Sequence, residues 1–266
     1  MLPQDYHTHS DFSCDCTAPM AKMCQGAVIQ DIAEIGFTEH FDLHPKEPCH
    51  NWFQPAPWWA ELERCRAEFA GQLTIRAGIE IGEPHLFATE AQQMLASWPF
   101  DYALGSLHWV DDDSMFDINY FKTHRAEDAY RAFFVELERM TRQGGFDILS
   151  HFDVFIRTSH AVYGPYDPSD YEALIRPVLR NCIDHGIALD LNTSALRKRA
   201  NVLTPDVEIL RWYAQMGGER VTLGSDAHKP VDIGSHLDVA IAMARDAGLR
   251  YLTYYEQRQA KLVPMP

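Results

Sequence analysis

The N-terminal stretch DYHTHSDFSCDC, residues 5–16, contains two histidines two positions apart and a carboxylate shortly after them. Side chains at positions i and i+2 of a β-strand point to the same face. His7 and His9 would therefore project together from a strand end, as two ligands of one metal ion do, and Asp15 follows them. An exposed, polar N-terminal strand explains this stretch equally well, so the rest of the chain has to decide.

Short apolar runs alternate with amphipathic segments along most of the chain, which predicts strands alternating with helices. This order favours parallel strands joined by crossover helices, and hence a closed or nearly closed α/β barrel. An open doubly wound sheet is the alternative, but the chain has no glycine-rich phosphate-binding loop. The expected strands are 3–9, 36–40, 73–81, 101–108, 147–151, 187–192, 220–225 and 251–255. The expected helices are 20–35, 58–70, 89–97, 126–142, 171–185, 205–216 and 237–247.

The bulk composition limits the class of protein and its partners. The chain has 266 residues, of which 46% are hydrophobic and 23% charged, and its formal net charge is -15. This length predicts a single α/β domain over residues 1–266. The negative charge disfavours nucleic acid, and no apolar run is long enough to span a bilayer, so we expect neither partner. Because no signal-peptide pattern is visible, the six cysteines are expected to be reduced thiols of a cytoplasmic protein.

Six histidines and three carboxylates fall at the ends of the expected strands or just beyond them. In a parallel barrel these ends open on one face, so residues far apart in sequence would meet there. Any one of them alone is more simply explained as a hydrogen-bonded loop or core residue, but their shared position favours a common site. The nine candidate ligands are His7, His9, Asp15, His40, Glu80, His108, His151, Asp226 and His228.

Imidazole and carboxylate ligands together suit zinc, manganese or iron rather than calcium. Nine ligands are too many for one ion, so we expect two or three divalent metals, with Glu80 as a bridging carboxylate. Such clusters favour hydrolysis of phosphoesters, because a metal polarises the phosphoryl oxygens and a bound water ionises near neutral pH. The expected substrate is therefore a small phosphorylated molecule.

Six short motifs, in this order, resemble the polymerase-and-histidinol-phosphatase (PHP) family: HTHSDFSCD, TEH, GIEIG, GSLH, SHFD and GSDAH. The resemblance covers about residues 5–236 and implies a distorted (β/α)7 TIM-like barrel with three metals. It implies a first metal on His7, His9, Glu80 and Asp226. It implies a second on Glu80, His108 and His151, and a third on Asp15, His40 and His228.

Two further segments, SHFDVFIR and LNTSALRK, resemble the histidinol-phosphate phosphatase branch of the family. This resemblance implies that Arg157 and Arg197 bind phosphate, a role that suits the planar guanidinium. It also implies hydrolysis of L-histidinol phosphate to L-histidinol and phosphate, with Asp226 or His228 as candidates for proton transfer. The alternative is a related phosphoesterase that acts on another small phosphomonoester or on a nucleotide.

The chain departs from the branch pattern at EIGEPHLF, where Glu83 and Pro84 replace an expected apolar continuation. Glu83 and His85, which follow the candidate ligand Glu80 closely, are therefore candidates for the substrate pocket. The segment HWVDDDSMFD, residues 108–117, is unusually acidic. Acidic residues there would suit a cationic amino alcohol, although a solvated loop explains them more simply. A metal-dependent amidohydrolase and a metal-binding module of a polymerase are the remaining alternatives.

Overall fold

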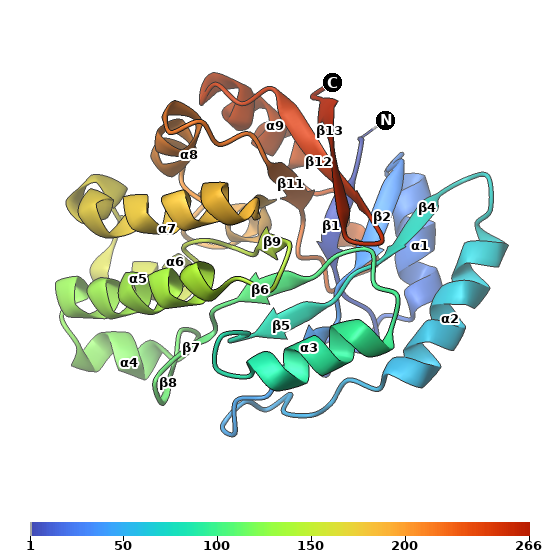
Figure 1. The fold of residues 1–266 in the computed structure, drawn as a ribbon, viewed down its shortest axis with the longest axis horizontal. Coiled ribbons are helices and arrows are strands. Elements are labelled where there is room, and N and C mark those ends of the chain that lie inside the picture. The colour runs from blue at the N-terminus through green and yellow to red at the C-terminus, as the bar shows by residue number, and fades with distance from the viewer. Residues whose placement is uncertain (1) are drawn as a thin grey trace.

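A closed set of parallel strands forms the centre of the protein (Figure 1). The computed structural model describes residues 2–266. The strands that build the barrel are β1 (Asp5–Thr8), β2 (Glu34–Phe37), β3 (His40–Phe41), β4 (Thr74–Ala77), β5 (Glu80–Gly82), β6 (Leu104–Ser106), β9 (Ile148–Leu149), β10 (Ala188–Asn192) and β11 (Val221–Gly224). They hydrogen-bond in two sheets, ordered β1-β2-β4 and β11-β10-β9-β6-β5-β3.

The two sheets together make seven strand positions. β2 and β3 are one strand interrupted at residues 38–39, and β4 and β5 are one strand interrupted at residues 78–79. An isolated parallel bridge between Thr8 and Ala227 joins the β1 end of one sheet to the β11 end of the other. The expected distorted (β/α)7 TIM-like barrel is therefore confirmed, and the distortion lies in the two interrupted strands.

Helices surround the strands and cover their outer faces (Figure 1). They are α1 (Met20–Ile29), α2 (Pro55–Glu68), α3 (Ala88–Ser97), α4 (Ile118–Thr123), α5 (Ala126–Gln143), α6 (Ile156–Tyr163), α7 (Glu172–His185), α8 (Val207–Gln215) and α9 (Leu237–Asp246). The longest, α5, buries Tyr130, Phe133, Leu137 and Met140, which recur at the three-to-four-residue spacing of one helix face. Burial of such faces against the strands fixes the barrel.

The second strand starts earlier than the sequence predicts. The helix expected over residues 20–35 ends at Ile29, and β2 already begins at Glu34. Asp31 has a positive φ of 55°, a backbone conformation that does not continue a right-handed helix. Ile32 and Ile35 continue the apolar spacing of the helix, so the hydrophobic pattern alone misplaces this boundary.

Three other segments differ from expectation. The apolar run at residues 251–255 forms β12 (Tyr251–Glu256), which pairs antiparallel with β13 (Gln259–Pro264) instead of adding an eighth parallel strand. Residues 109–114 form a small hairpin of β7 (Trp109–Val110) and β8 (Asp113–Ser114), and the short α4 follows it. The helix α6 begins at Ile156, shortly after the expected strand end at His151, and carries Arg157.

Side chains complete the seam where β1 meets β11. Gln4 accepts a hydrogen bond from the backbone N–H of Leu223 (3.2 Å) through its Oε1 atom. Asp5 accepts one from the N–H of Ser225 (2.8 Å) and one from the N–H of Gly234 (2.9 Å), one on each carboxylate oxygen. These side chains satisfy buried backbone donors that a regular strand ladder would otherwise satisfy.

We expect Asp5→Asn to destabilise the fold. The amide has only one acceptor oxygen, so one of the two backbone N–H groups that Asp5 binds would lose its partner. The loss should be about 1–3 kcal/mol in the free energy of unfolding, the usual cost of a buried unsatisfied donor. Urea unfolding followed by circular dichroism measures it. The exposed Asp246→Asn is the matched control, and equal stability of the two variants would contradict the role of Asp5 in the seam.

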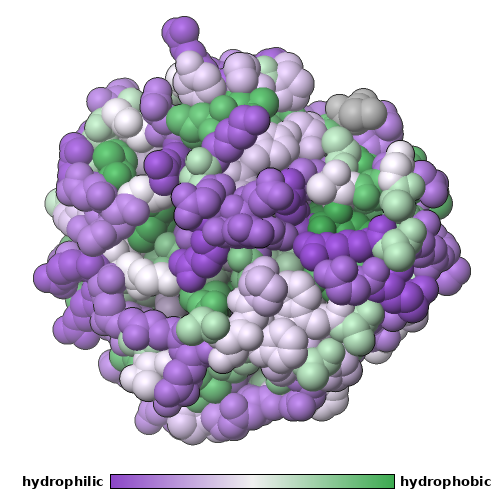
Figure 2. Space-filling view, turned by 45° about the vertical axis from the view of Figure 1, so that its right-hand side comes forward, coloured by the Kyte–Doolittle hydropathy of each residue, from purple (hydrophilic) through white to green (hydrophobic). Residues whose placement is uncertain are grey.

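Polar and charged residues separate small apolar patches on the face shown in Figure 2. Within residues 2–266, every helix is too short or too polar to cross a bilayer.

Candidate metal centre

All nine candidate ligands lie at the carboxyl ends of the barrel strands or in the loops that follow. His7 belongs to β1 and His9 follows it, while His40 and Glu80 begin the outer parts of the two interrupted strands. The others follow β6, β9 and β11, except Asp15, which lies in the loop after β1. Overlapping groups of three ligand-type residues in this region have donor atoms within 4.8 Å of one another. The structure therefore brings the predicted residues together.

Glu80 lies at the centre of this cluster and is 1% exposed. β3 pairs with β5 in a register that sets His40 opposite Glu80. The two carboxylate oxygens face five imidazoles: those of His7 (3.4 Å), His9 (3.5 Å), His40 (3.1 Å), His108 (3.5 Å) and His151 (3.0 Å). A single buried carboxylate among so many nitrogen donors has the position of a bridging ligand.

Asp15 and His228 extend the cluster toward solvent. The Nε2 atom of His228 lies 3.1 Å from a carboxylate oxygen of Asp15, and the Nε2 atom of His40 lies 3.6 Å from the same oxygen. The ring of His228 stacks on that of His9 with centroids 4.2 Å apart. These contacts bring together the three residues predicted to bind a third metal. They lie beside the residues predicted to bind the first two metals around Glu80.

Several inward-facing atoms of the cluster are buried and make no well-oriented hydrogen bond, although groups of opposite charge lie near them. They are Nε2 of His7, Nε2 of His9, Nδ1 of His40, Oε2 of Glu80 and Nε2 of His228. Buried polar atoms without partners are costly, and metal coordination is a common way to satisfy them. Nitrogen and carboxylate donors of this kind fit divalent transition metals.

Opposite charges set the protonation of the cluster. Burial by itself would raise the pKa of Glu80, but His7 and His40 hold it well below its usual range. Burial likewise opposes the charged form of His7, yet Glu80 and Asp226 raise its pKa well above the usual value. For His108 the carboxylates of Asp42 and Glu80 outweigh burial and raise the pKa to about 10. The site is therefore a strongly coupled ionic cluster.

A second layer of carboxylates orients the imidazoles. Asp190, in the buried strand β10, lies 2.8 Å from Nδ1 of His7 and accepts a hydrogen bond from Asn192 (3.0 Å). A Cβ atom on Gly224 would collide with the Asp190 carboxylate and the Cβ of His7, so only glycine allows this close approach.

Glu39 anchors the loop that follows β1. It accepts hydrogen bonds from the backbone N–H and hydroxyl of Ser10, from the hydroxyl of Ser13 and from the indole of Trp58. The Ser13 hydroxyl in turn lies 3.1 Å from Nδ1 of His9. Neither Asp190 nor Glu39 is among the residues predicted for the site. In the sequence, each is recognisable as a charged residue inside or beside an apolar strand.

We expect Asp190→Asn to weaken metal binding by about 10- to 100-fold, the usual effect of removing a carboxylate that holds a ligating histidine. Dialysis against graded concentrations of a chelator, followed by elemental analysis of the protein, measures metal retention directly. The exposed Asp184→Asn on α7 is the control. Equal retention by both variants would mean that Asp190 does not orient His7.

Arg157 lines the cavity over the cluster, whereas Arg197 is not part of that lining. The Nη2 atom of Arg157 donates to Asp226 (2.6 Å) and to Asn192 (3.1 Å), and its Nε atom is buried without a partner. Arg197 donates through Nη2 to the carbonyl of Ser225 (2.8 Å), and its Nη1 atom is buried without a partner. Each arginine thus has at least one buried nitrogen donor without a partner.

Neither Glu83 nor His85 is among the residues that line the cavity over the cluster. Glu83 is buried at a positive φ of 45°, and its Oε1 atom accepts the backbone N–H groups of His108 (2.6 Å) and Trp109 (3.0 Å). It supports the loop after β6, which carries the candidate ligand His108, and is not part of the cavity lining. His85 pairs with Glu136 on α5 (2.7 Å) and also lies outside that lining.

Burial raises the pKa of Glu83 to about 7, so its folded form keeps a proton that the unfolded chain loses near pH 4.5. This group should therefore make the wild type lose stability as the pH rises from about 4.5 to about 7. Glu83→Gln keeps the Oε1 acceptor and removes the titration. We expect its unfolding free energy, relative to wild type, to rise across that interval and to level off above it.

Urea unfolding at several pH values tests this expectation for Glu83→Gln. The exposed Glu63→Gln on α2 is the control. Parallel stability curves for Glu83→Gln and the wild type would contradict the raised pKa.

A cavity of about 300 Å³ opens over the cluster. Glu80, His108, His151, Asp226 and Arg157 line it from the barrel side. The loops that follow β1, β3 and β6 contribute Cys14, Glu47, Cys49 and Phe116. The cavity therefore joins the candidate metal ligands and Arg157 to a space suited to a small molecule.

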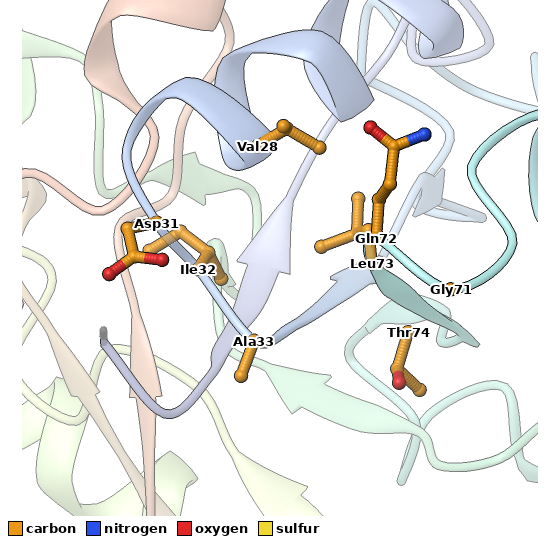
Figure 3. Close-up of a pocket in the computed structure, with 8 residues that line it drawn as sticks. All are labelled: Val28, Asp31, Ile32, Ala33, Gly71, Gln72, Leu73 and Thr74. Atoms are coloured by element: carbon orange, nitrogen blue, oxygen red, sulfur yellow. The ribbon is translucent and has the colours of Figure 1, made fainter.

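A second cavity, of about 500 Å³, lies at the opposite ends of β2 and β4 (Figure 3). Its walls come from the end of α1 and from the segments that enter the two strands, and they include Val28, Ile32 and Leu73. Asp31 is the one ionisable residue in its lining. Size therefore does not identify the functional site in this protein, whereas the chemistry of the lining does.

A disulfide joins Cys14 to Cys49, whose Cα atoms are 5.6 Å apart. This corrects the expectation that all six cysteines are thiols, although Cys16, Cys24, Cys65 and Cys182 are free and buried. The pattern C-x-C gives no hint of the pairing, because the partner lies 35 residues away and only the tertiary fold brings the loops together. The bond ties the loop that carries Asp15 to the loop after β3.

We expect the double variant Cys14→Ser/Cys49→Ser to lose up to about 4 kcal/mol of unfolding free energy, from the loop-closure entropy of a 35-residue separation. Because Asp15 is then held less firmly, the variant should also retain less metal per chain. Urea unfolding and elemental analysis measure the two effects. A dithiol reductant should lower the wild type to the level of the variant and leave the variant unchanged. A wild type insensitive to the reductant would contradict this.

The fold and the site define a class of protein: a parallel α/β barrel with a histidine-and-carboxylate cluster at the carboxyl ends of its strands. Residues 5–194 match the PHP domain family, and the chain belongs to that family. The probable histidinol-phosphatase of Deinococcus radiodurans is 29% identical over 274 residues, which cover 98% of each chain. The histidinol-phosphatase of Lactococcus lactis is 28% identical over 86% of this chain and 85% of its own.

Solved structures show the same fold. The histidinol phosphate phosphatase of Lactococcus lactis, in complex with zinc, L-histidinol and phosphate, superposes with a TM-score of 0.88. The two chains are 24% identical, and the match covers 97% of this chain and 98% of the other. A putative histidinol phosphatase from Listeria monocytogenes gives a TM-score of 0.76 at 18% identity, over 89% of this chain and 99% of its own.

Proposed function

We propose that this protein is a metal-dependent phosphatase that hydrolyses L-histidinol phosphate to L-histidinol and phosphate. The observation that carries the proposal is the buried Glu80 carboxylate among five imidazoles, with Arg157 beside it in one cavity. The names of the curated relatives, and the ligands of the Lactococcus lactis structure, support histidinol phosphate as the substrate. A place in histidine biosynthesis follows from that substrate.

The residues proposed to hold three divalent ions divide as follows. The first ion would be held by His7, His9, Glu80 and Asp226, and the second by Glu80, His108 and His151. The third would be held by Asp15, His40 and His228. Zinc, manganese and iron all suit these donors. The chemistry that such ions supply is polarisation of the phosphoryl oxygens and a lowered pKa for a nearby water.

The arginines would bind and orient the phosphate. Arg157 lines the cavity and its Nε donor has no partner, which supports a role for its guanidinium in gripping an outer phosphate oxygen. Arg197 lies outside the cavity lining. It would act on the phosphate through its unpartnered Nη1 donor, or indirectly by fixing the Ser225–Asp226 backbone that it already binds. Together they would stabilise negative charge on the phosphoryl oxygens as the ester bond breaks.

Proton transfer remains with Asp226 or His228. Burial would raise the pKa of Asp226, but Arg157 and His7 hold it well below the usual range, so this carboxylate can accept a proton and not donate one near neutral pH. Burial opposes the charged form of His228, yet Asp15 and Asp226 raise its pKa. With the ions bound, each of the two residues would coordinate through a deprotonated atom, so both stay candidates for proton transfer and neither is assigned as the donor to the departing alkoxide.

We expect the chelator-treated protein to be inactive and to regain phosphate release from L-histidinol phosphate when zinc or manganese is added. Arg157→Ala should lower kcat/KM by about 10- to 100-fold, the loss of one charge-assisted hydrogen bond. Arg197→Ala should have a smaller effect, because it lies outside the cavity lining. Arg211→Ala, on the exposed face of α8, is the control.

A panel of substrates separates this proposal from its alternative, a PHP-type phosphoesterase for another small phosphomonoester or a nucleotide. Equal turnover of sugar phosphates or nucleotides would contradict the histidinol phosphate assignment and leave the metal-dependent hydrolysis standing. No activity with any phosphoester and any of the three metals would overturn both.

A further inference from the structure

The cavity contains an acidic group that neither the candidate metal ligands nor the phosphate contacts explain. Glu47 lies in the loop between β3 and α2, lines the cavity and is half-buried. Its Oε2 atom accepts a hydrogen bond from the indole of Trp109 (2.7 Å), and its Oε1 atom accepts a long one from the backbone of Cys49 (3.4 Å). Both donors are neutral, so the negative charge of Glu47 is not compensated there.

No basic side chain within residues 2–266 forms an ion pair with Glu47. The neighbouring Lys46 is directed to Asp112 instead, at 3.2 Å. The other carboxylates of the lining all face candidate ligand histidines or Arg157, as Asp42 faces His40 and His108 at 3.6 Å. Glu47 is therefore the carboxylate of this cavity without a charged partner.

The surroundings hold Glu47 in place. The ring of Trp109 stacks on that of His44, with centroids 4.3 Å apart, and the His44 ring lies 3.1 Å from the carbonyl oxygen of Asp111. The Cys14–Cys49 disulfide fixes the same loop two residues further on. A carboxylate held by an aromatic pair and a cross-link is preorganised, which reduces the entropy lost on binding a ligand.

A free carboxylate would repel a substrate that carries only a phosphate. It favours binding only if the same molecule also carries a cation, and it then disfavours molecules that lack one. Phe116, 44% exposed, lines the same cavity, with its ring 5.4 Å from that of His108. An exposed aromatic ring in the same cavity as a carboxylate suits a cationic group that is attached to an apolar or aromatic body.

We propose that Glu47 is a specificity-determining residue that binds the ammonium group of an amino-alcohol phosphate, with Phe116 packed against the rest of that molecule. The inference rests on the proposed function and names the group that selects the amine. The phosphate would lie over the metal cluster and Arg157, and the protonated amine would donate a hydrogen bond to Glu47. Trp109 acts through Glu47 as a positioning residue.

The test compares L-histidinol phosphate with propyl phosphate, a phosphomonoester without an amine, on the wild type and on Glu47→Gln loaded with the same metal. We expect the variant to lose about 10- to 100-fold of the wild-type selectivity, expressed as the ratio of the two kcat/KM values, mainly through KM for L-histidinol phosphate. The product L-histidinol should inhibit the variant correspondingly less. Glu63→Gln is the control for an exposed carboxylate.

A second variant distinguishes the loss of the Glu47 charge from a structural effect of the substitution. Glu47→Asp keeps the charge, so it should recover part of the selectivity that Glu47→Gln loses, and thermal unfolding of both variants reports their folding. If Glu47→Gln lowers both kcat/KM values by the same factor, or if Glu47→Asp is no better, the assignment of Glu47 is overturned. If the wild type itself does not prefer L-histidinol phosphate, the proposed function fails instead, and the two failures are distinguishable.

Discussion

The arrangement of this protein depends on a carboxylate, Glu80, that is almost completely removed from water. An isolated buried charge of this kind costs several kcal/mol, so it persists only where opposite charges or a bound cation surround it. The barrel provides those surroundings by ending its strands around the same point. β5 starts at Glu80, its partner β3 starts at His40, and β1 brings His7 from the other sheet. The interruptions of the second and third strands lie directly before His40 and Glu80.

The same constraint accounts for the carboxylates outside the cluster. An imidazole that faces a metal with one nitrogen needs a partner on the other, because this fixes both its tautomer and its orientation. Asp190 provides that partner for His7, and Glu39 acts on His9 through Ser13. At the seam, Asp226 donates its backbone N–H to the carbonyl of His7 (2.7 Å). Candidate metal ligands from the first and last barrel strands are thus tied by the hydrogen bonds that close the barrel.

The sequence predicted the barrel and the nine converging residues because both depend on local patterns. Strand ends can be recognised by apolar runs, and a polar residue after each run, such as His108 or His151, is visible without the structure. The features that could not be predicted depend on tertiary contacts. Asp190 sits inside an apolar strand, where the sequence gives no partner for it. Cys14 and Cys49 meet only because two loops cross the same cavity. The end of α1 depends on the backbone of Asp31, which a hydrophobic pattern does not reveal.

The charges of the cavity are arranged in two regions, and this arrangement restricts what it can bind. The candidate metal centre and Arg157 would attract the oxygens of a phosphate, whereas the loop after β3 presents the carboxylate of Glu47. A molecule with one anionic and one cationic group can satisfy both regions at once. A sugar phosphate satisfies only the first, and it leaves the carboxylate to be desolvated without a partner, which costs free energy. A metal-dependent hydrolase can therefore select one substrate through a single group outside its metal centre. That group rejects competitors as well as attracting the amine.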